Sequence, residues 1–109
     1  MPLSARTRVV GIIGDPVAHS LSPVMHNAAF RALKLDYTYV AFHVPPTQLR
    51  AAVAGIRALG IAGVNVTVPH KERVMAFLDS FSPTAGRAGA VNTILNQNGH
   101  LHGDNTDVA

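Results

Sequence analysis

The stretch Val9-Val10-Gly11-Ile12-Ile13-Gly14-Asp15-Pro16 decides the fold class. Its short apolar run, rich in β-branched residues, predicts a buried strand, and Gly-Asp-Pro predicts the turn that ends it. The run is short and leads directly into Gly14-Asp15-Pro16, so it is interpreted as a buried strand and not as a signal peptide or a membrane span.

Downstream, apolar runs alternate with segments of helical periodicity, a pattern typical of βαβ units. Strands are expected at 9–13, 37–44 and 64–68, with helices from 22 to about 34, from 47 to 60 and from 69 to about 78. Ser22 and Pro23 suit the start of the first helix, and Met25, Ala29 and Leu33 are its expected buried stripe. A short helical piece is expected near Ala85.

The C-terminal part predicts a hairpin. Strands at 90–95 and around Leu101 are joined across Asn98-Gly99, a dipeptide that tolerates the backbone angles of a tight turn. The predicted fold is therefore α/β: an open, mostly parallel, twisted sheet with flanking helices in three layers (α/β/α) and a short C-terminal hairpin. The 109 residues suffice for one domain, spanning 1–109.

Composition narrows the classes of function. With 48% hydrophobic and 14% charged residues, the chain has the composition of a packed globule, expected to be a soluble cytoplasmic protein. The nine basic residues lie singly along the chain, which argues against a nucleic-acid surface. The chain has no cysteine, and its six dispersed histidines match no metal-ligand spacing, so no metal site and no membrane association are predicted.

The first candidate set is His19-Ser20-Leu21-Ser22-Pro23, in which two hydroxyls flank the start of a helix. A helix N-terminus presents unpaired N–H groups and a partial positive charge, so Ser20 and Ser22 suit the anionic end of a ligand. The alternative is structural: Ser22 serves as the N-cap of the helix and Ser20 as a turn residue.

The second set is Asn65-Val66-Thr67-Val68-Pro69-His70-Lys71. Period-2 alternation places Asn65 and Thr67 on the same side of a strand end, where they could line a site for a hydroxylated ligand. Lys71 is expected in the first turn of the following helix, where the helix dipole disfavours a cation and so favours the neutral amine that proton transfer uses. The alternative is that Lys71 belongs to a solvated helix edge.

Two further sets carry weaker signals. Gly89-Ala90-Val91-Asn92-Thr93 leads into a strand with an amide and a hydroxyl. Gly103-Asp104-Asn105-Thr106-Asp107 is typical of an Asx turn, although Asp107 could instead be the carboxylate paired with Lys71. Gly11 and Gly14 lack the third glycine and the helix start of a dinucleotide fingerprint, so they are interpreted as packing positions and no cofactor-binding residue is assigned.

Taken together and in this order, the four sets resemble the shikimate dehydrogenase family, in which NADPH reduces 3-dehydroshikimate to shikimate on the way to aromatic amino acids. The resemblance covers most of the chain. It implies that Lys71 and Asp107 are the catalytic acid/base pair. It further implies that the substrate is bound at its carboxylate by Ser20 and Ser22, and at its ring hydroxyls by Asn65, Thr67, Asn92 and Asp107.

The family continues past its Asn-Thr-Asp motif into a Rossmann domain that binds NADP, and that domain is expected to be absent from this chain. NADP is therefore expected for the complete enzyme, while this chain alone is expected to bind no nucleotide and to have no dehydrogenase activity. The expected partners are a small-molecule substrate and the missing nucleotide-binding domain, and a homodimer is left open. The alternatives are a stand-alone binding module for small hydroxy acids and a fragment of a quinate/shikimate dehydrogenase.

Overall fold

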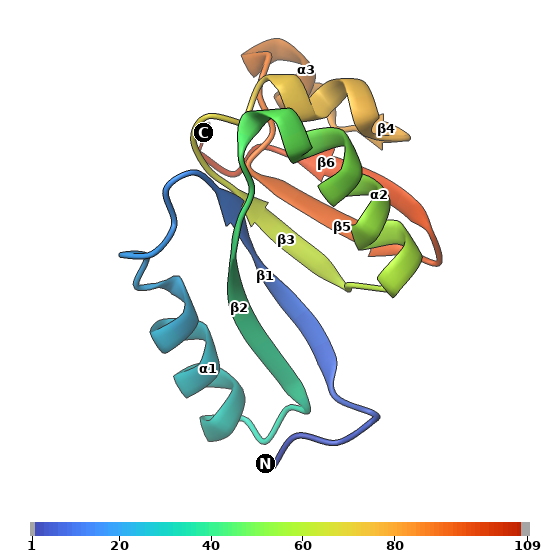
Figure 1. The fold of residues 1–109 in the computed structure, drawn as a ribbon. Coiled ribbons are helices and arrows are strands. Elements are labelled where there is room, and N and C mark those ends of the chain that lie inside the picture. The colour runs from blue at the N-terminus through green and yellow to red at the C-terminus, as the bar shows by residue number, and fades with distance from the viewer. Residues whose placement is uncertain (1, 108–109) are drawn as a thin grey trace.

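Six strands form a single mixed sheet in the order β2-β1-β3-β5-β6-β4 (Figure 1). The structure is a computed structural model and describes residues 2–107. The strands are β1 (Arg8–Gly14), β2 (Tyr37–His43), β3 (Gly63–Val66), β4 (Ser80–Phe81), β5 (Thr93–Gln97) and β6 (His100–Asp104). The predicted α/β class and the C-terminal hairpin are confirmed, and the two-residue strand β4 was not predicted because it is too short to show a period.

Strand direction determines which chain segments meet at each edge of the sheet. β1 pairs in parallel with both β2 and β3, whereas β5 runs antiparallel to both β3 and β6. β4 is parallel to β6. Within residues 2–107, β5 therefore runs against the other strands, and the sheet is mostly parallel as predicted.

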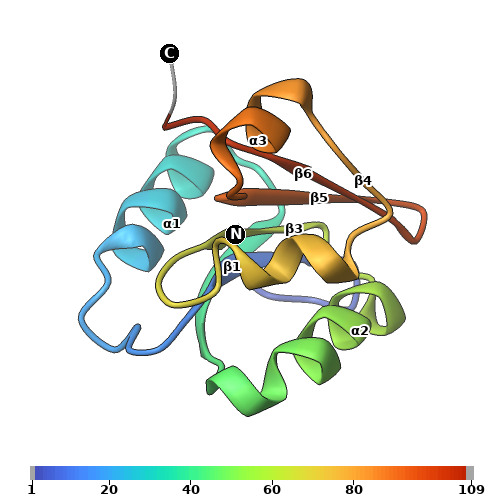
Figure 2. The ribbon, with the colours of Figure 1, turned by 90° about the horizontal axis from the view of Figure 1, so that it is seen from above.

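The helices lie on both faces of the sheet, which gives three layers (Figure 2). They are α1 (Ser22–Ala32), η1 (Pro46–Gln48, 3₁₀), α2 (Leu49–Leu59), η2 (Arg73–Phe77, 3₁₀) and α3 (Pro83–Ala88). α2 is followed by Gly60, whose φ of 64° is the left-handed conformation in which many helices end, and the helix predicted from 47 to 60 thus stops where expected. Among residues 2–107, none of these helices combines the length and the apolar composition needed to cross a bilayer.

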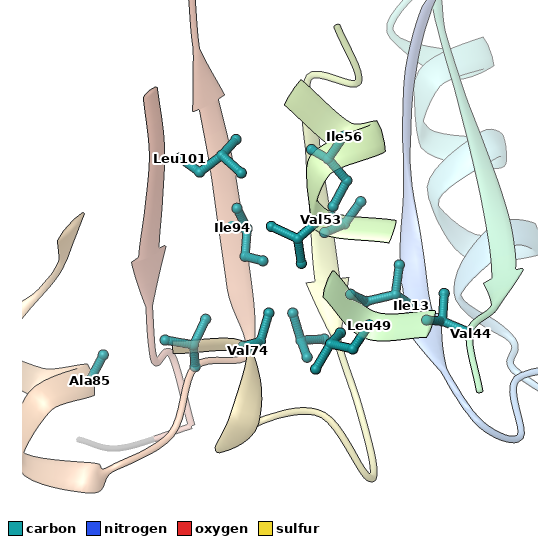
Figure 3. Close-up of a cluster of buried hydrophobic side chains, with 12 residues drawn as sticks. Ile13, Val44, Leu49, Val53, Ile56, Val74, Ala85, Ile94 and Leu101 are labelled. Carbon is teal, nitrogen blue, oxygen red and sulfur yellow. The ribbon is translucent and has the colours of Figure 1, made fainter. Parts of the chain in front are cut away.

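The hydrophobic core lies between α2 and one face of the sheet (Figure 3). Leu49, Val53 and Ile56 form the buried face of α2. They belong to one cluster with residues of the sheet and η2, including Ile13, Val64, Val66, Val74, Ile94 and Leu101. Burial of this apolar surface is the main driving force for the fold.

The expected buried stripe of α1 is wrong. Met25 and Leu33 are 66% and 67% exposed, and the helix has no buried residue. α1 instead packs over β2 through the neighbouring face: the His26 ring stacks on Tyr39, and Phe30 packs against Tyr37. The stripe was misassigned because periodicity fixes the spacing of contact positions but does not show which face of a short helix meets an edge strand.

The helix expected from Pro69 to about residue 78 is also wrong. Val68 and Pro69 lie in a turn, with the Val68–Pro69 peptide in cis, and the 3₁₀ helix η2 begins only at Arg73. Val68 is 61% exposed, so it does not continue the buried side of the strand formed by Val64 and Val66. The polar segment that follows β3 is therefore a turn that projects from the sheet edge.

Candidate functional site

The candidate residues gather where four strand ends meet. β1 and β3 end at this edge, β6 ends there too, and the reversed strand β5 begins there (Figure 1). The register pairs Asn65 with Thr93 and Thr93 with Asp104. Because ligands of open α/β sheets bind at the carboxyl ends of parallel strands, this edge is the expected place for a site.

Lys71 and Asp107 meet at this edge. The Lys71 Nζ donates a hydrogen bond to Asp107 Oδ2 at 3.1 Å, although the residues are 36 positions apart. Their side chains are 36% and 60% exposed, so a ligand can reach both. The backbone carbonyl of Lys71 accepts a hydrogen bond from Val91 N at 2.8 Å, which ties the turn to the segment before β5.

One premise about Lys71 is wrong. The residue lies in the turn ahead of η2 and not in the first turn of a helix, so no helix dipole acts on it in the way the sequence suggested. The structure instead places a carboxylate beside the amine. The ion pair with Asp107, rather than a helix terminus, is the electrostatic feature of this position.

Asn105 holds Asp107 in place, a role that sequence reasoning did not assign. Asn105 is 7% exposed; its Oδ1 accepts a hydrogen bond from Asp107 N at 2.9 Å, and its Nδ2 donates to Ala90 O at 3.1 Å. The first of these bonds is an Asx turn, so the local turn and the pairing with Lys71 exist together. The sequence signal that could have revealed this role is the two-residue spacing of Asn105 and Asp107, which is the spacing of an Asx turn.

Asn92 is largely occupied by protein contacts. It is 8% exposed, and its Oδ1 accepts hydrogen bonds from Thr106 N at 3.1 Å and from the Thr93 hydroxyl at 3.0 Å. Its Nδ2 donates to Thr106 Oγ1 at 2.9 Å. A primary amide has two N–H donors, so Asn92 can offer one to a ligand while bracing the segment that carries Asp107.

Ser20 and Ser22 lie at the start of α1, with a different division of roles from the one expected. The N-cap position is Leu21, not Ser22, and the Ser20 hydroxyl accepts a hydrogen bond from Ser22 N at 3.2 Å. Ser20 and Thr67 line one pocket of about 320 Å³, together with Val17 and His19. Ser20 of the first set and Thr67 of the second therefore line the same space.

Asn65 lies beside a buried phenol. The Tyr39 hydroxyl donates to Asn65 Oδ1 at 2.8 Å, and Tyr39 is 4% exposed. Both residues line a mainly apolar groove of about 450 Å³ between α1 and the sheet, next to Phe30 and Leu35. Sequence reasoning did not include Tyr39 in the site; the signal that it missed is that a buried tyrosine usually finds a partner for its hydroxyl.

A second carboxylate at this edge is held by hydrogen bonds. The Ser82 hydroxyl donates to Asp104 Oδ1 at 2.6 Å, and Asn105 N donates to the same oxygen at 2.8 Å. The hydrogen bond from the Ser82 hydroxyl lowers the pKa of Asp104 most, followed by the hydrogen bond from the Asn105 backbone. Desolvation raises this pKa, and the nearby charge of His102 lowers it by a smaller amount, so that the pKa of Asp104 lies below its usual range. The ionised form of Asp104 is therefore favoured by folding.

Asp104→Asn should consequently lower stability in a pH-dependent way. The pKa of Asp104 is lower in the folded than in the unfolded protein, so the ionised carboxylate stabilises the fold. This stabilisation is fully present above the pKa of an unfolded Asp, about 3.9, and is lost as the pH falls through the pKa of the folded state. Urea unfolding at pH 7 should give a lower midpoint for Asp104→Asn than for the wild type, and the gap should close towards pH 2. A gap of equal size at both pH values would contradict this account.

The described residues do not fit a dinucleotide. A Cβ on Gly11 would overlap with the Val40 carbonyl, and one on Gly14 would overlap with the Thr67 methyl. These glycines therefore serve close packing, and a seven-residue segment separates β1 from α1, so no helix begins directly after the strand. Residues 2–107 also contain no group of three or more acidic, histidine or cysteine side chains arranged to hold a metal ion.

Comparison with known proteins finds one family over most of the chain. Residues 12–94 match the family model described as "Shikimate dehydrogenase substrate binding domain". The chain is 64% identical over 100 residues to the shikimate dehydrogenase (NADP(+)) of Symbiobacterium thermophilum, covering 92% of this chain and 34% of that protein. The chain thus spans about a third of the length of this curated relative.

Solved structures show the same fold. The shikimate 5-dehydrogenase of Listeria monocytogenes, solved in complex with shikimate and NAD, superimposes with a TM-score of 0.95 at 45% identity, covering 98% of this chain and 37% of that one. A 5-ketofructose reductase of Gluconobacter sp. gives a TM-score of 0.92 at 33% identity, covering 95% and 38%. The family match extends over most of the chain, and the chain therefore belongs to the shikimate dehydrogenase family, whose substrate-binding domain it contains.

Proposed function

We propose that this chain holds the substrate of an NADP-dependent shikimate dehydrogenase, which interconverts 3-dehydroshikimate and shikimate. The observation that carries the proposal is the contact between Lys71 Nζ and Asp107 Oδ2 at the sheet edge where the other polar candidates gather. An amine and a carboxylate within hydrogen-bond distance, both reachable by a ligand, can exchange a proton with a bound hydroxyl or carbonyl oxygen.

The remaining residues would orient the ligand. Ser20 and Ser22 would bind the carboxylate at the start of α1, where backbone N–H groups add a favourable partial charge. Thr67, which faces the same pocket as Ser20, would bind a ring hydroxyl, as would Asn65 and the free N–H of Asn92. Asp107 would both bind a ring hydroxyl and act with Lys71 in proton transfer.

Binding of the nucleotide is not part of the role proposed for residues 2–107. These residues do not fit it, so a nucleotide-binding domain elsewhere would have to present the nicotinamide. The domain proposed for residues 1–109 would then bind the ring and place its reacting oxygen beside Lys71. We expect no oxidation of NADPH by this chain alone in the presence of 3-dehydroshikimate.

A binding module for an uncharged sugar is the competing function, because a 5-ketofructose reductase shares the fold at 33% identity. The serine pair discriminates between the two. Ser20 and Ser22 suit a carboxylate, which shikimate and quinate carry and 5-ketofructose lacks. Quinate differs from shikimate by an added hydroxyl and the lost ring double bond, so relative affinity for these two acids would report the finer specificity of the pocket.

Titration of shikimate into the chain tests the proposed function. We expect saturable chemical-shift changes in ¹⁵N NMR spectra at Ser20, Thr67 and Lys71, and no saturable change with 5-ketofructose. Ser20→Ala should weaken shikimate binding, because it removes a donor to the carboxylate. Ser4→Ala, at an exposed serine near the N-terminus, is the matched control. Equal affinity for the acid and the ketose would contradict the proposal.

A further inference from the structure

Tyr39 connects three elements at the candidate site. Its hydroxyl donates to Asn65 Oδ1 on β3 at 2.8 Å. Its backbone N–H donates to Asn27 Oδ1 at 2.8 Å, and its carbonyl accepts from Asn27 Nδ2 at 2.9 Å, so one side chain of α1 holds both backbone groups. The His26 ring stacks on the phenol ring, with centroids 4.3 Å apart and an interplanar angle of 5°. Tyr39 is thus held in position through both its backbone and its ring.

The direction of the Tyr39–Asn65 bond determines how the Asn65 amide is oriented. A phenol has one proton, and here it is given to the amide oxygen. The Nδ2 group of Asn65 then points away from Tyr39 with two N–H donors, and within residues 2–107 it donates to no protein atom. Asn65 is therefore held as a donor and would favour an acceptor oxygen of the ligand.

The phenol keeps the proton that this arrangement needs. Burial raises the pKa of Tyr39, and interaction with the Ser22 side chain lowers it by less. The hydroxyl consequently remains protonated over the neutral range and can donate to the Asn65 amide oxygen.

We propose that Tyr39 is a positioning residue that holds the Asn65 amide with its N–H groups towards the ligand. The inference rests on the proposed function for its ligand, shikimate. The competing interpretation is that Tyr39 is a core residue whose hydroxyl is merely satisfied by Asn65. The two interpretations differ in whether loss of the hydroxyl changes binding through Asn65.

Tyr39→Phe tests this by removing the hydroxyl while keeping the ring. We expect the Kd for shikimate, measured by calorimetric titration of the chain, to rise about fivefold to tenfold, which lies within the range that the loss of one hydrogen bond causes. Tyr37→Phe is the matched control: it lies two residues earlier on the same strand and lines the same groove, with its ring packed against Phe30. Its Kd should stay within about twofold of the wild type.

A double-mutant cycle separates positioning from packing. If Tyr39 acts through Asn65, then Tyr39→Phe should cause no further loss of affinity in an Asn65→Ala background. Additive losses would show that Tyr39 acts independently of Asn65 and would overturn the inference. Thermal unfolding of each variant verifies that the fold is intact, and Tyr39→Phe should unfold within a few degrees of the wild type.

The inference and the proposed function can fail separately. If the wild-type chain binds shikimate and Tyr39→Phe binds it equally well, the inference is wrong and the proposed function stands. If the wild-type chain binds no shikimate, the proposed function fails, and the inference is then tested by the orientation of the Asn65 amide. In that case the Nδ2 proton signals of Asn65 should change their NOE contacts in Tyr39→Phe but not in Tyr37→Phe, and unchanged contacts in both variants would overturn it.

Discussion

Lys71→Ala should lower kcat by about a hundredfold to ten-thousandfold, with a much smaller change in KM. The assay needs a nucleotide-binding domain, which a chimera supplies: residues 2–107 replace the matching segment of the Symbiobacterium thermophilum relative, with which the chain is 64% identical over 100 residues. Reduction of 3-dehydroshikimate is followed by the loss of NADPH absorbance. The large effect on kcat is expected because a proton donor acts mainly in the transition state.

Arg73→Ala is the control for this prediction. Arg73 is an exposed cation two residues from Lys71, so its removal changes the local charge by the same amount without touching the pair. Asp107→Asn should also reduce kcat, since the amide keeps the shape of the side chain but cannot take up a proton. A Lys71→Ala chimera with unchanged kcat and a raised KM would show that Lys71 binds the substrate without transferring a proton.

Gly11→Ala should lower the free energy of unfolding by about 1–3 kcal/mol, the range for overpacking a well-packed interior. Gly11 lies on β1 opposite Val40 of β2, and an added Cβ would overlap with the Val40 carbonyl and with the Phe42 ring. A side-chain rotation can move the ring, but the carbonyl belongs to the backbone of the paired strand. The two strands would have to shift apart, which costs hydrogen-bond geometry along the sheet.

Gly55→Ala is the matched substitution, and we expect it to raise the free energy of unfolding where Gly11→Ala lowers it. Gly55 lies inside α2, and a Cβ there meets no atom within 4 Å. Alanine is favoured over glycine in a helix interior by about 1 kcal/mol, so this variant should be more stable than the wild type. Urea unfolding at neutral pH measures both variants. A Gly11→Ala protein as stable as Gly55→Ala would contradict the close approach of β1 and β2.

The sheet and its site edge could be predicted because strong local signals agreed. The apolar run at 9–13, the helix stop at Gly60 and the turn at Asn98-Gly99 all lie where the sequence indicated. Lys71 and Asp107 were proposed as a pair from a family resemblance, and the structure brings them within 3.1 Å. Parallel topology made this proximity reasonable, since it brings the ends of distant strands to the same edge.

The parts that could not be predicted depend on contacts between distant segments. The face of α1 that packs inward is set by the edge strand β2, whose aromatic residues meet His26 and Phe30 and leave Met25 exposed. The bond from Tyr39 to Asn65 joins β2 to β3 across β1, and no local pattern contains it. Lys71 was placed in a helix because proline often starts one, whereas here Pro69 lies in a turn.

The reversed direction of β5 has a practical consequence for labelling the protein. The turn between β5 and β6 lies at the end of the sheet remote from Lys71 and Asp107, and β5 spans five residues, or roughly 17 Å. The chain contains no cysteine, so Gln97→Cys, at an exposed position beside this turn, would create a unique thiol. A fluorophore or surface linker attached there would leave the ligand-facing edge unobstructed.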